Sequence, residues 1–70
     1  MSKKQNINDR IFFVSCIIEL YASKHNIKGN EAEALFNNKG IDTWLYNNYE
    51  ILHTEDEKNV ILEIYEHFGV

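Results

Sequence analysis

Proline is absent from this 70-residue sequence, and cysteine is almost absent. The one cysteine, Cys16, cannot form an internal disulfide, and no cysteine pair has the spacing of a structural zinc site. A chain of this length buries only about 60% of its unfolded surface, so a single core contributes roughly 3–5 kcal/mol. Dense helix packing or self-association is therefore the expected source of stability.

Long apolar runs are also missing. The run at residues 11–14 is followed by Ser15 and then Glu19, so no stretch reaches the roughly 18 uninterrupted apolar residues that a membrane span requires. No secretory leader is recognisable, and a lone thiol is consistent with a reducing compartment. We expect a cytoplasmic protein with no membrane partner.

Positive charge is scarce in the second part of the chain. Residues 1–40 carry six Lys and Arg against four acids, a balance of +2, whereas residues 41–70 carry Lys58 alone against seven acids, a balance of −6. An acidic half repels phosphate backbones and suits a basic protein surface. A solvated acidic face that aids solubility explains the same pattern.

Residues 8–24 form the most hydrophobic segment. Two neighbouring apolar rows at helical spacing cover more than half of the helix circumference, which predicts packing on two sides. A buried strand is the rival interpretation for residues 11–18, but the length of the periodic pattern favours a helix.

Three further segments have helical spacing, and glycines punctuate them. The four expected helices cover residues 8–24, 30–39, 42–52 and 55–68. The sequence thus predicts an all-α fold, a small compact bundle of four short helices. Residues 1–6 are expected to be a flexible N-terminus and residues 7–70 a single helical domain.

A sharp corner is predicted between the last two helices. Thr54 and Glu57 have the spacing of a capping box, in which each side chain accepts a hydrogen bond from the other residue's backbone N–H. His53 stands at this corner and is expected to bond to backbone. These three residues form the predicted structural corner.

Similar signals mark the second and third helices. Asn30 and Glu33 form a cap-like pair, and Asp42 is the expected N-cap of the third helix. Gly40 stands where a left-handed residue commonly ends a helix.

The three histidines provide little support for a metal site. His25, His53 and His67 lie on different segments, and zinc bound by them with Glu50 or Asp56 is conceivable. The positions of His25 and His67 near helix C-termini favour contact with exposed carbonyls instead. We predict neither a metal nor a cofactor.

Catalytic patterns are equally weak. A dyad of Cys16 with His53 can be drawn, but a thiol on an apolar helix face is usually inert. No phosphate-binding glycine loop is present, and the clustered carboxylates fall on exposed helix faces without a pocket. We expect no enzyme and no catalytic residue.

The segments around Gly40 faintly resemble a helix-turn-helix, a motif that binds DNA. The helix that would read the bases, residues 43–50, contains no Lys or Arg and does contain Glu50. DNA-binding helices need cations for phosphates and commonly arginine for guanine. We therefore expect no nucleic-acid partner.

Surplus aromatic residues are the better functional indication. Phe12 falls on the polar strip of the first helix, and Tyr46 points away from the apolar stripe of the third. Exposed aromatics are enriched at protein interfaces, although in a small domain they also cover the edge of the core. With the acids of the second half, they define the candidate interaction surface of Phe12, Tyr46, Glu63 and Glu66.

The order of several short motifs resembles a known family. They are Phe12-Phe13, residues 21–27 with Gly29, Leu35-Phe36, Gly40-Ile41, residues 49–54 and residues 61–64. Together they resemble a short bacterial domain family of about this length without an established activity, and the Leu-His-Thr corner is the most specific part. Its members are often encoded beside proteins similar to ADP-ribosyltransferases, which implies a small antitoxin-like partner.

Two functions follow as hypotheses. The first is a non-catalytic protein-interaction module that binds a co-encoded protein. The second is a self-associating, homodimeric structural or regulatory protein, whose melting temperature would depend on concentration.

Overall fold

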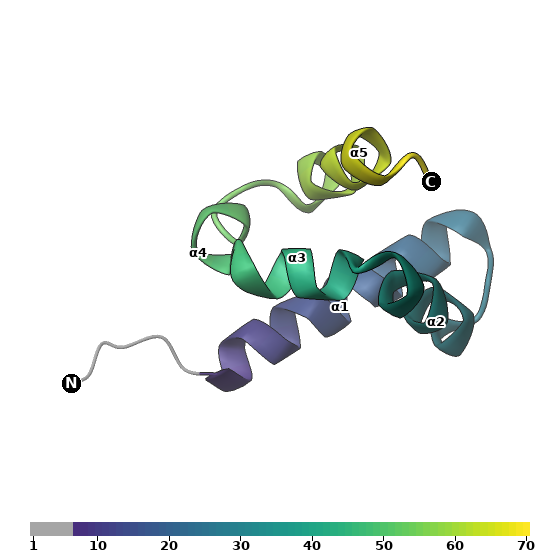
Figure 1. Ribbon diagram of the computed structural model, residues 1–70, viewed down its shortest axis with the longest axis horizontal. Coiled ribbons are helices and arrows are strands. Elements are labelled where there is room, and N and C mark those ends of the chain that lie inside the picture. The colour runs from purple at the N-terminus through teal and green to yellow at the C-terminus, as the bar shows by residue number, and fades with distance from the viewer. Residues whose placement is uncertain (1–6) are drawn as a thin grey trace.

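The computed structural model describes residues 7–70, and this part of the chain is entirely helical with no strand (Figure 1). The helices are α1 (Ile7–His25), α2 (Gly29–Lys39), α3 (Ile41–Asn47), α4 (Tyr49–Leu52) and α5 (Glu57–Phe68). Four of them have seven residues or more, so the predicted all-α fold is confirmed. The expected flexible segment, residues 1–6, lies outside the described residues. None of the described helices is long and apolar enough to cross a membrane.

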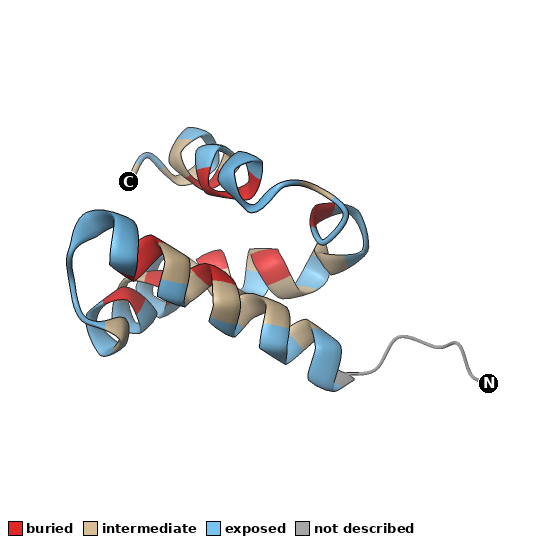
Figure 2. Cartoon of the chain, turned by 180° about the vertical axis from the view of Figure 1, so that it is seen from behind, coloured by how far each residue is buried: buried red, intermediate tan, exposed pale blue. Residues whose placement is uncertain are grey.

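The core forms around the second half of α1. Ile17, Tyr21 and Ala22 are buried there in one cluster with buried side chains of α2, α3 and α5. Figure 2 colours the buried residues of each helix red. The buried side chains are Ile17, Tyr21, Ala22, Ala32, Phe36, Ile41, Leu45, Leu52, Val60, Ile61 and Ile64. All are apolar or aromatic, so the helices are held together mainly by removal of hydrophobic surface from water.

Aromatic contacts connect the helices to one another. The ring of Tyr21 meets Phe36 of α2 edge-on, with 5.2 Å between the ring centroids. On α5, Phe68 meets Trp44 of α3 in the same way at 5.6 Å. Edge-to-face pairs of this kind add to the stability gained from burial.

Gly40 makes the turn between α2 and α3 as predicted. Its φ of 76° is left-handed, and its N–H donates to the carbonyls of Asn37 and Phe36, which ends α2. Because α3 already begins at Ile41, Gly40 also takes the N-cap position, and the prediction of Asp42 as N-cap was wrong. The carboxylate of Asp42 instead accepts from the Thr43 N–H at 2.8 Å.

The N-terminus of α2 differs from the predicted Asn30 and Glu33 pair. The helix begins at Gly29, so its N-cap is Lys28. The Glu31 carboxylate accepts a hydrogen bond from the Lys28 N–H at 3.0 Å. Glu31 therefore takes the place in the capping box that was predicted for Glu33, because the helix starts earlier than the apolar pattern indicates.

The predicted helix at residues 42–52 is divided in two at Asn48. Asn48 has φ −107° and ψ 17°, and its side-chain amide donates to the Trp44 carbonyl at 2.8 Å. Asparagine side chains compete with backbone for such bonds, which weakens a helix at their position. The break lets α4 turn towards the start of α1.

The corner before α5 uses different residues from those predicted. Asp56 is the N-cap, and its carboxylate accepts from the Lys58 N–H at 3.0 Å. The Thr54 hydroxyl points back and donates to the Ile51 carbonyl at 2.8 Å. The predicted capping box of Thr54 and Glu57 was therefore wrong, because Glu57 is the first residue of α5 and lies too close to the cap.

Candidate interaction surface

Residues 8–16, in the first half of α1, are exposed or half-buried, whereas the buried residues of this helix lie in its second half (Figure 2). Phe12 is 71% exposed and Ile11 is 51% exposed, whereas Ile17 is fully buried. The two exposed side chains line different hollows, one on each flank of α1. Apolar surface is therefore available on both sides of the same three turns.

Arg10 connects this open half of α1 to the bend between α3 and α4. Its guanidinium donates to the Tyr46 carbonyl at 2.6 Å and pairs with the Glu50 carboxylate at 3.3 Å. The same group lies 5.4 Å from the ring centroids of both Tyr46 and Tyr49. Cation–π contact and a charge-assisted hydrogen bond thus fix the orientation of the exposed turns.

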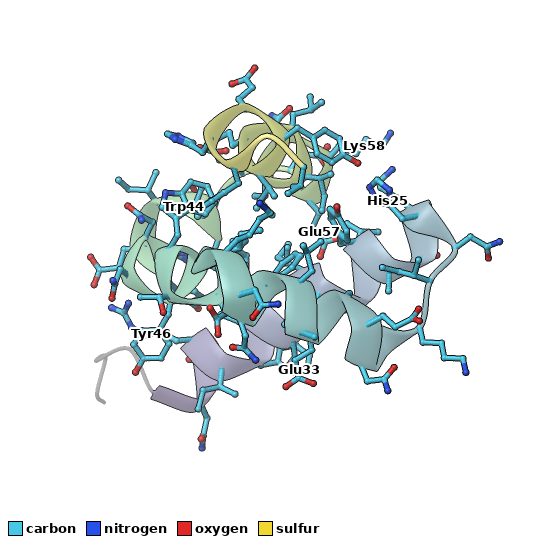
Figure 3. The ribbon with its side chains drawn as sticks, turned by 45° about the vertical axis from the view of Figure 1, so that its right-hand side comes forward. His25, Glu33, Trp44, Tyr46, Glu57 and Lys58 are labelled. Carbon is cyan, nitrogen blue, oxygen red and sulfur yellow. The ribbon has the colours of Figure 1, made fainter. Side chains whose placement is uncertain are left out.

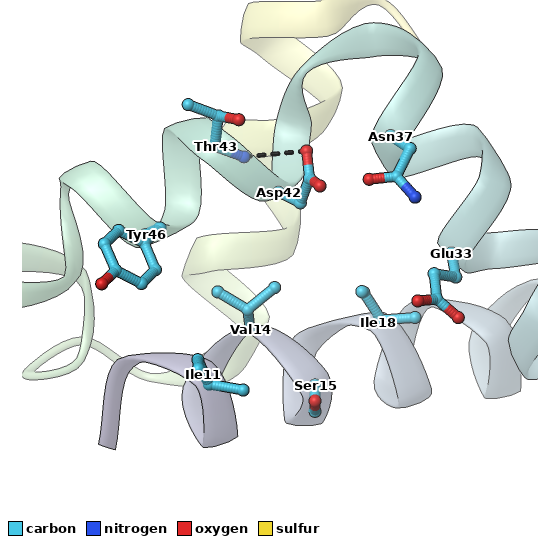
Figure 4. A pocket seen from close by; sticks show the side chains of 9 residues that line it. All are labelled: Ile11, Val14, Ser15, Ile18, Glu33, Asn37, Asp42, Thr43 and Tyr46. Carbon is cyan, nitrogen blue, oxygen red and sulfur yellow. Dashed lines mark hydrogen bonds between the residues drawn. The ribbon is translucent and has the colours of Figure 1, made fainter. Parts of the chain in front are cut away.

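On one flank, α1, α2 and α3 enclose a groove of about 340 Å³ (Figure 4). We call it the acidic groove and define it by Ile11, Val14, Ile18, Glu33, Asp42 and Tyr46. A second hollow shares Ile18 and Glu33 with it and continues along α1 to Glu19. Asp42 lies across the groove from the apolar side chains of α1, and the Glu33 carboxylate lies beside Ile18 at one end of it.

On the other flank, a hollow of about 220 Å³ lies between α1 and the corner before α5. We call it the Phe12 hollow; its lining includes Phe12, Phe13, Cys16, Tyr49, His53 and Glu57. The predicted backbone bond of His53 is confirmed, since its Nδ1 lies 2.7 Å from the Tyr49 carbonyl and its ring stacks on Tyr49. Cys16 and His53 share this hollow, but no hydrogen bond joins them.

The four residues of the predicted interaction surface are not brought together in one place. Phe12 and Tyr46 lie at the two hollows beside the open half of α1. Glu63 is half-buried and Glu66 exposed, both on α5, and neither lines these hollows. Tyr46 itself is half-buried against Arg10, so Phe12 is the exposed aromatic of the four.

Glu63 has a distinctive electrostatic environment. Its pKa is raised above the usual 4.5, first by a hydrogen bond with the Glu55 carboxyl and then by burial and by repulsion from Glu55. His67 opposes this shift, and Glu66 adds to it. One oxygen of Glu55, Oε1, is buried without a hydrogen-bond partner. The Glu55 carboxyl therefore makes Glu63 easier to protonate than an isolated glutamate.

The remaining histidines lie at helix ends as predicted, but within the described chain the contacts of their rings are with aromatic side chains and not with the expected helix carbonyls. His25 is the last residue of α1 and points towards α5; its Nε2 lies 2.8 Å from the Tyr65 hydroxyl (Figure 3). Its ring also stacks on Tyr21 at 4.2 Å. In the last turn of α5, His67 lies 5.2 Å from the Trp44 ring. No group of His, Cys, Asp and Glu within residues 7–70 is placed to hold a metal ion.

Sequence reasoning missed the acidic groove. Ile11, Val14, Ile18 and Tyr21 form one row at helical spacing, which predicts burial along the whole row. Of this row the structure buries Tyr21, whereas Val14 and Ile18 are half-buried and Ile11 is exposed. A usable signal was helix length, since α1 has 19 residues and α2 and α5 have 11 and 12.

The chain has also been compared with known proteins. No curated protein and no solved structure gives a significant match. A family model described as a protein of unknown function, DUF3791, matches residues 12–68. The match includes Phe12, both hollows in large part and the corner before α5, and the chain is thus a member of the DUF3791 family.

Proposed function

We propose that this protein is a non-catalytic protein-interaction module, an antitoxin-like partner that covers a protein encoded beside it. The observation that carries the proposal is the open half of α1, where Phe12 is 71% exposed and Ile11 is 51% exposed on opposite flanks. Neighbouring large apolar side chains that stay exposed on a small domain are typical of sites that bind proteins.

The fixed orientation of these turns supports the same function. Arg10 ties the open half of α1 to Tyr46 and Glu50, so the exposed side chains are presented from an ordered helix. A surface that is ordered before binding loses less conformational entropy when a partner docks. The acidic balance of residues 41–70 adds an electrostatic preference for a basic partner.

Co-expression with the neighbouring protein tests the proposal. Size exclusion with light scattering should detect a mixed complex, and Phe12→Ser should weaken it by at least about tenfold, as expected for an aromatic anchor. Leu62→Ser is the matched control, because Leu62 is 53% exposed on α5 and lies away from both hollows. The control should bind as tightly as the parent protein.

Three outcomes would contradict the proposal. Absence of a mixed complex would show that the protein does not bind the protein encoded beside it. If both substitutions weakened the complex equally, the contact would not be specific to α1. A homodimer that ignores the neighbour and dissociates with Phe12→Ser would make this surface a contact between copies, which is the self-association alternative.

A further inference from the structure

The apolar side of the acidic groove repeats at each turn of α1. Ile11, Val14 and Ile18 are separated by three and four residues, and all three remain partly exposed. At 1.5 Å per residue, they extend over roughly 10 Å, the length of about two helical turns. This spacing matches the apolar anchors that a docked helix presents to a groove.

The groove is also lined by negative charge. Glu33 of α2 and Asp42 of α3 line it, and Glu19 of α1 lines its continuation. No Lys or Arg lines either hollow. Neither Glu19 nor Glu33 has an ion-pair partner in the described part of the chain. The carboxylates therefore attract cationic side chains that flank an apolar surface.

The walls of the groove favour a helical occupant. They are built from α1, α2 and α3, whose backbone groups bond within their own helices, and residues 7–70 contain no strand edge to extend. An extended peptide would find no strand edge with which to pair its backbone N–H and C=O groups at such a surface. A helix satisfies its own backbone bonds and can bind through side chains alone.

We infer that the acidic groove binds an amphipathic helix of a partner protein, with lysine or arginine on both sides of its apolar face. The inference rests on the proposed function and names the chemistry of the partner. A second copy of the chain fits less well, because each copy has a net charge of −4 and the copies repel one another.

The test uses the full chain labelled with ¹⁵N and two synthetic peptides of about four helical turns, long enough to form a helix. Both carry leucine at helical spacing along one face. The first has lysine on the flanks of that face, and the second has glutamate at every lysine position. The basic peptide should shift the amide signals of Val14, Ile18, Glu33 and Thr43 and reach saturation, whereas the acidic peptide should not bind.

Charge-reversed variants identify the acids responsible. The double variant Glu19→Lys/Glu33→Lys should weaken binding of the basic peptide by about tenfold, since each exposed charge contributes modestly. Glu63→Lys/Glu66→Lys makes the same charge change on α5 and should leave the affinity within about twofold, as expected for charges outside the contact. Glu33→Lys alone, at an exposed helix position, should give about a threefold loss and guards against misfolding of the double variant.

Several results would overturn the inference. Equal binding of the two peptides would show that the groove has no preference for a basic helix. If neither peptide bound, the groove would not be a binding site for a helix. Shifts centred on Cys16, Tyr49 or α5 would place the contact elsewhere. Concentration-dependent shifts at Val14 and Ile18 without peptide would assign the groove to a second copy.

Failure here is distinguishable from failure of the proposed function. If the mixed complex depends on Phe12 but is unaffected by Glu19→Lys/Glu33→Lys, the protein is an interaction module whose partner does not bind in the acidic groove. Selective binding of the basic peptide without a mixed complex keeps the groove chemistry and removes the co-encoded partner.

Discussion

In its second half α1 packs against Phe36 of α2 and Tyr65 of α5, whereas in its first half Ile11 and Phe12 are more than half exposed. Both halves carry isoleucine, an aromatic residue and a continuous helical pattern. The difference comes from which helices pack there, since α2 and α5 contact the second half, whereas the first half meets α3 and α4 through Arg10 and Phe13. Periodicity therefore locates an apolar face on α1, and the placement of its neighbours decides which part of that face is buried.

The largest effect should come from shortening isoleucine on either side of this boundary. Ile17→Ala removes a fully buried side chain and should lower the free energy of unfolding by about 2–5 kcal/mol. Ile11→Ala, at 51% exposure, should cost less than about 1 kcal/mol, because little surface is lost and alanine favours the helix. Urea unfolding followed by circular dichroism measures both.

The stability of a domain this small limits that experiment. If Ile17→Ala does not fold, Ile17→Val should give a measurable loss of about 0.5–1.5 kcal/mol. Similar losses at the two positions would show that the first half of α1 is covered in solution and would abolish the distinction between the halves.

A smaller loss of stability is expected at Arg10, which connects the first half of α1 to α3 and α4. Arg10→Ala removes a hydrogen bond to the Tyr46 carbonyl and the contact with two aromatic rings, which should cost about 1–2 kcal/mol. Amide hydrogen exchange should accelerate in the first turns of α1 and change little between Ile17 and His25.

Glu50→Gln is the control for the ion pair. The Glu50 side chain is 70% exposed, so its loss should change stability by less than about 0.5 kcal/mol. If Glu50→Gln lowered stability as much as Arg10→Ala, the contribution of Arg10 would come from its ion pair with Glu50. Unchanged exchange in Arg10→Ala would mean that the first turns are ordered without Arg10.

Much of the fold was predictable because it depends on local signals. The helical spacing predicted the helices, and Gly40 ends α2 at the position where its left-handed φ is needed. His53 likewise bonds to a carbonyl four residues before it. Each of these features depends on residues that are close together in the chain.

The errors occurred where side chains compete for the same backbone groups. Asn48 bonds back to Trp44 and divides a helix, and Thr54 bonds back to Ile51 and leaves the N-cap to Asp56. Either residue could also have served as a cap or a helix interior position, and the sequence does not state which bond is made.

The candidate site was predictable only in part. Phe12 is identifiable as an aromatic on a polar strip, and it is exposed. The contact between Arg10 and Tyr46 joins residues 36 positions apart, and the acidic groove combines residues from three helices. Such long-range pairings depend on how the helices pack, which periodicity within one segment does not specify.

The smallest effect concerns α5, which covers the second half of α1, and it depends on pH. Because the Glu63 pKa is raised in the fold, mainly by its hydrogen bond with Glu55, protonated Glu63 contributes stability that is fully present below pH 4.5. This contribution is lost as the pH rises through the raised pKa.

Glu63→Gln keeps a hydrogen-bond donor and cannot ionise, so relative to the parent its stability should improve from pH 4 to pH 7 by less than about 1 kcal/mol. Urea unfolding at both pH values measures the change, with Glu66→Gln as the control on the exposed face of α5. A Glu63→Gln variant that loses stability relative to the parent as the pH rises would mean that ionised Glu63, rather than its protonated form, holds α5 in place.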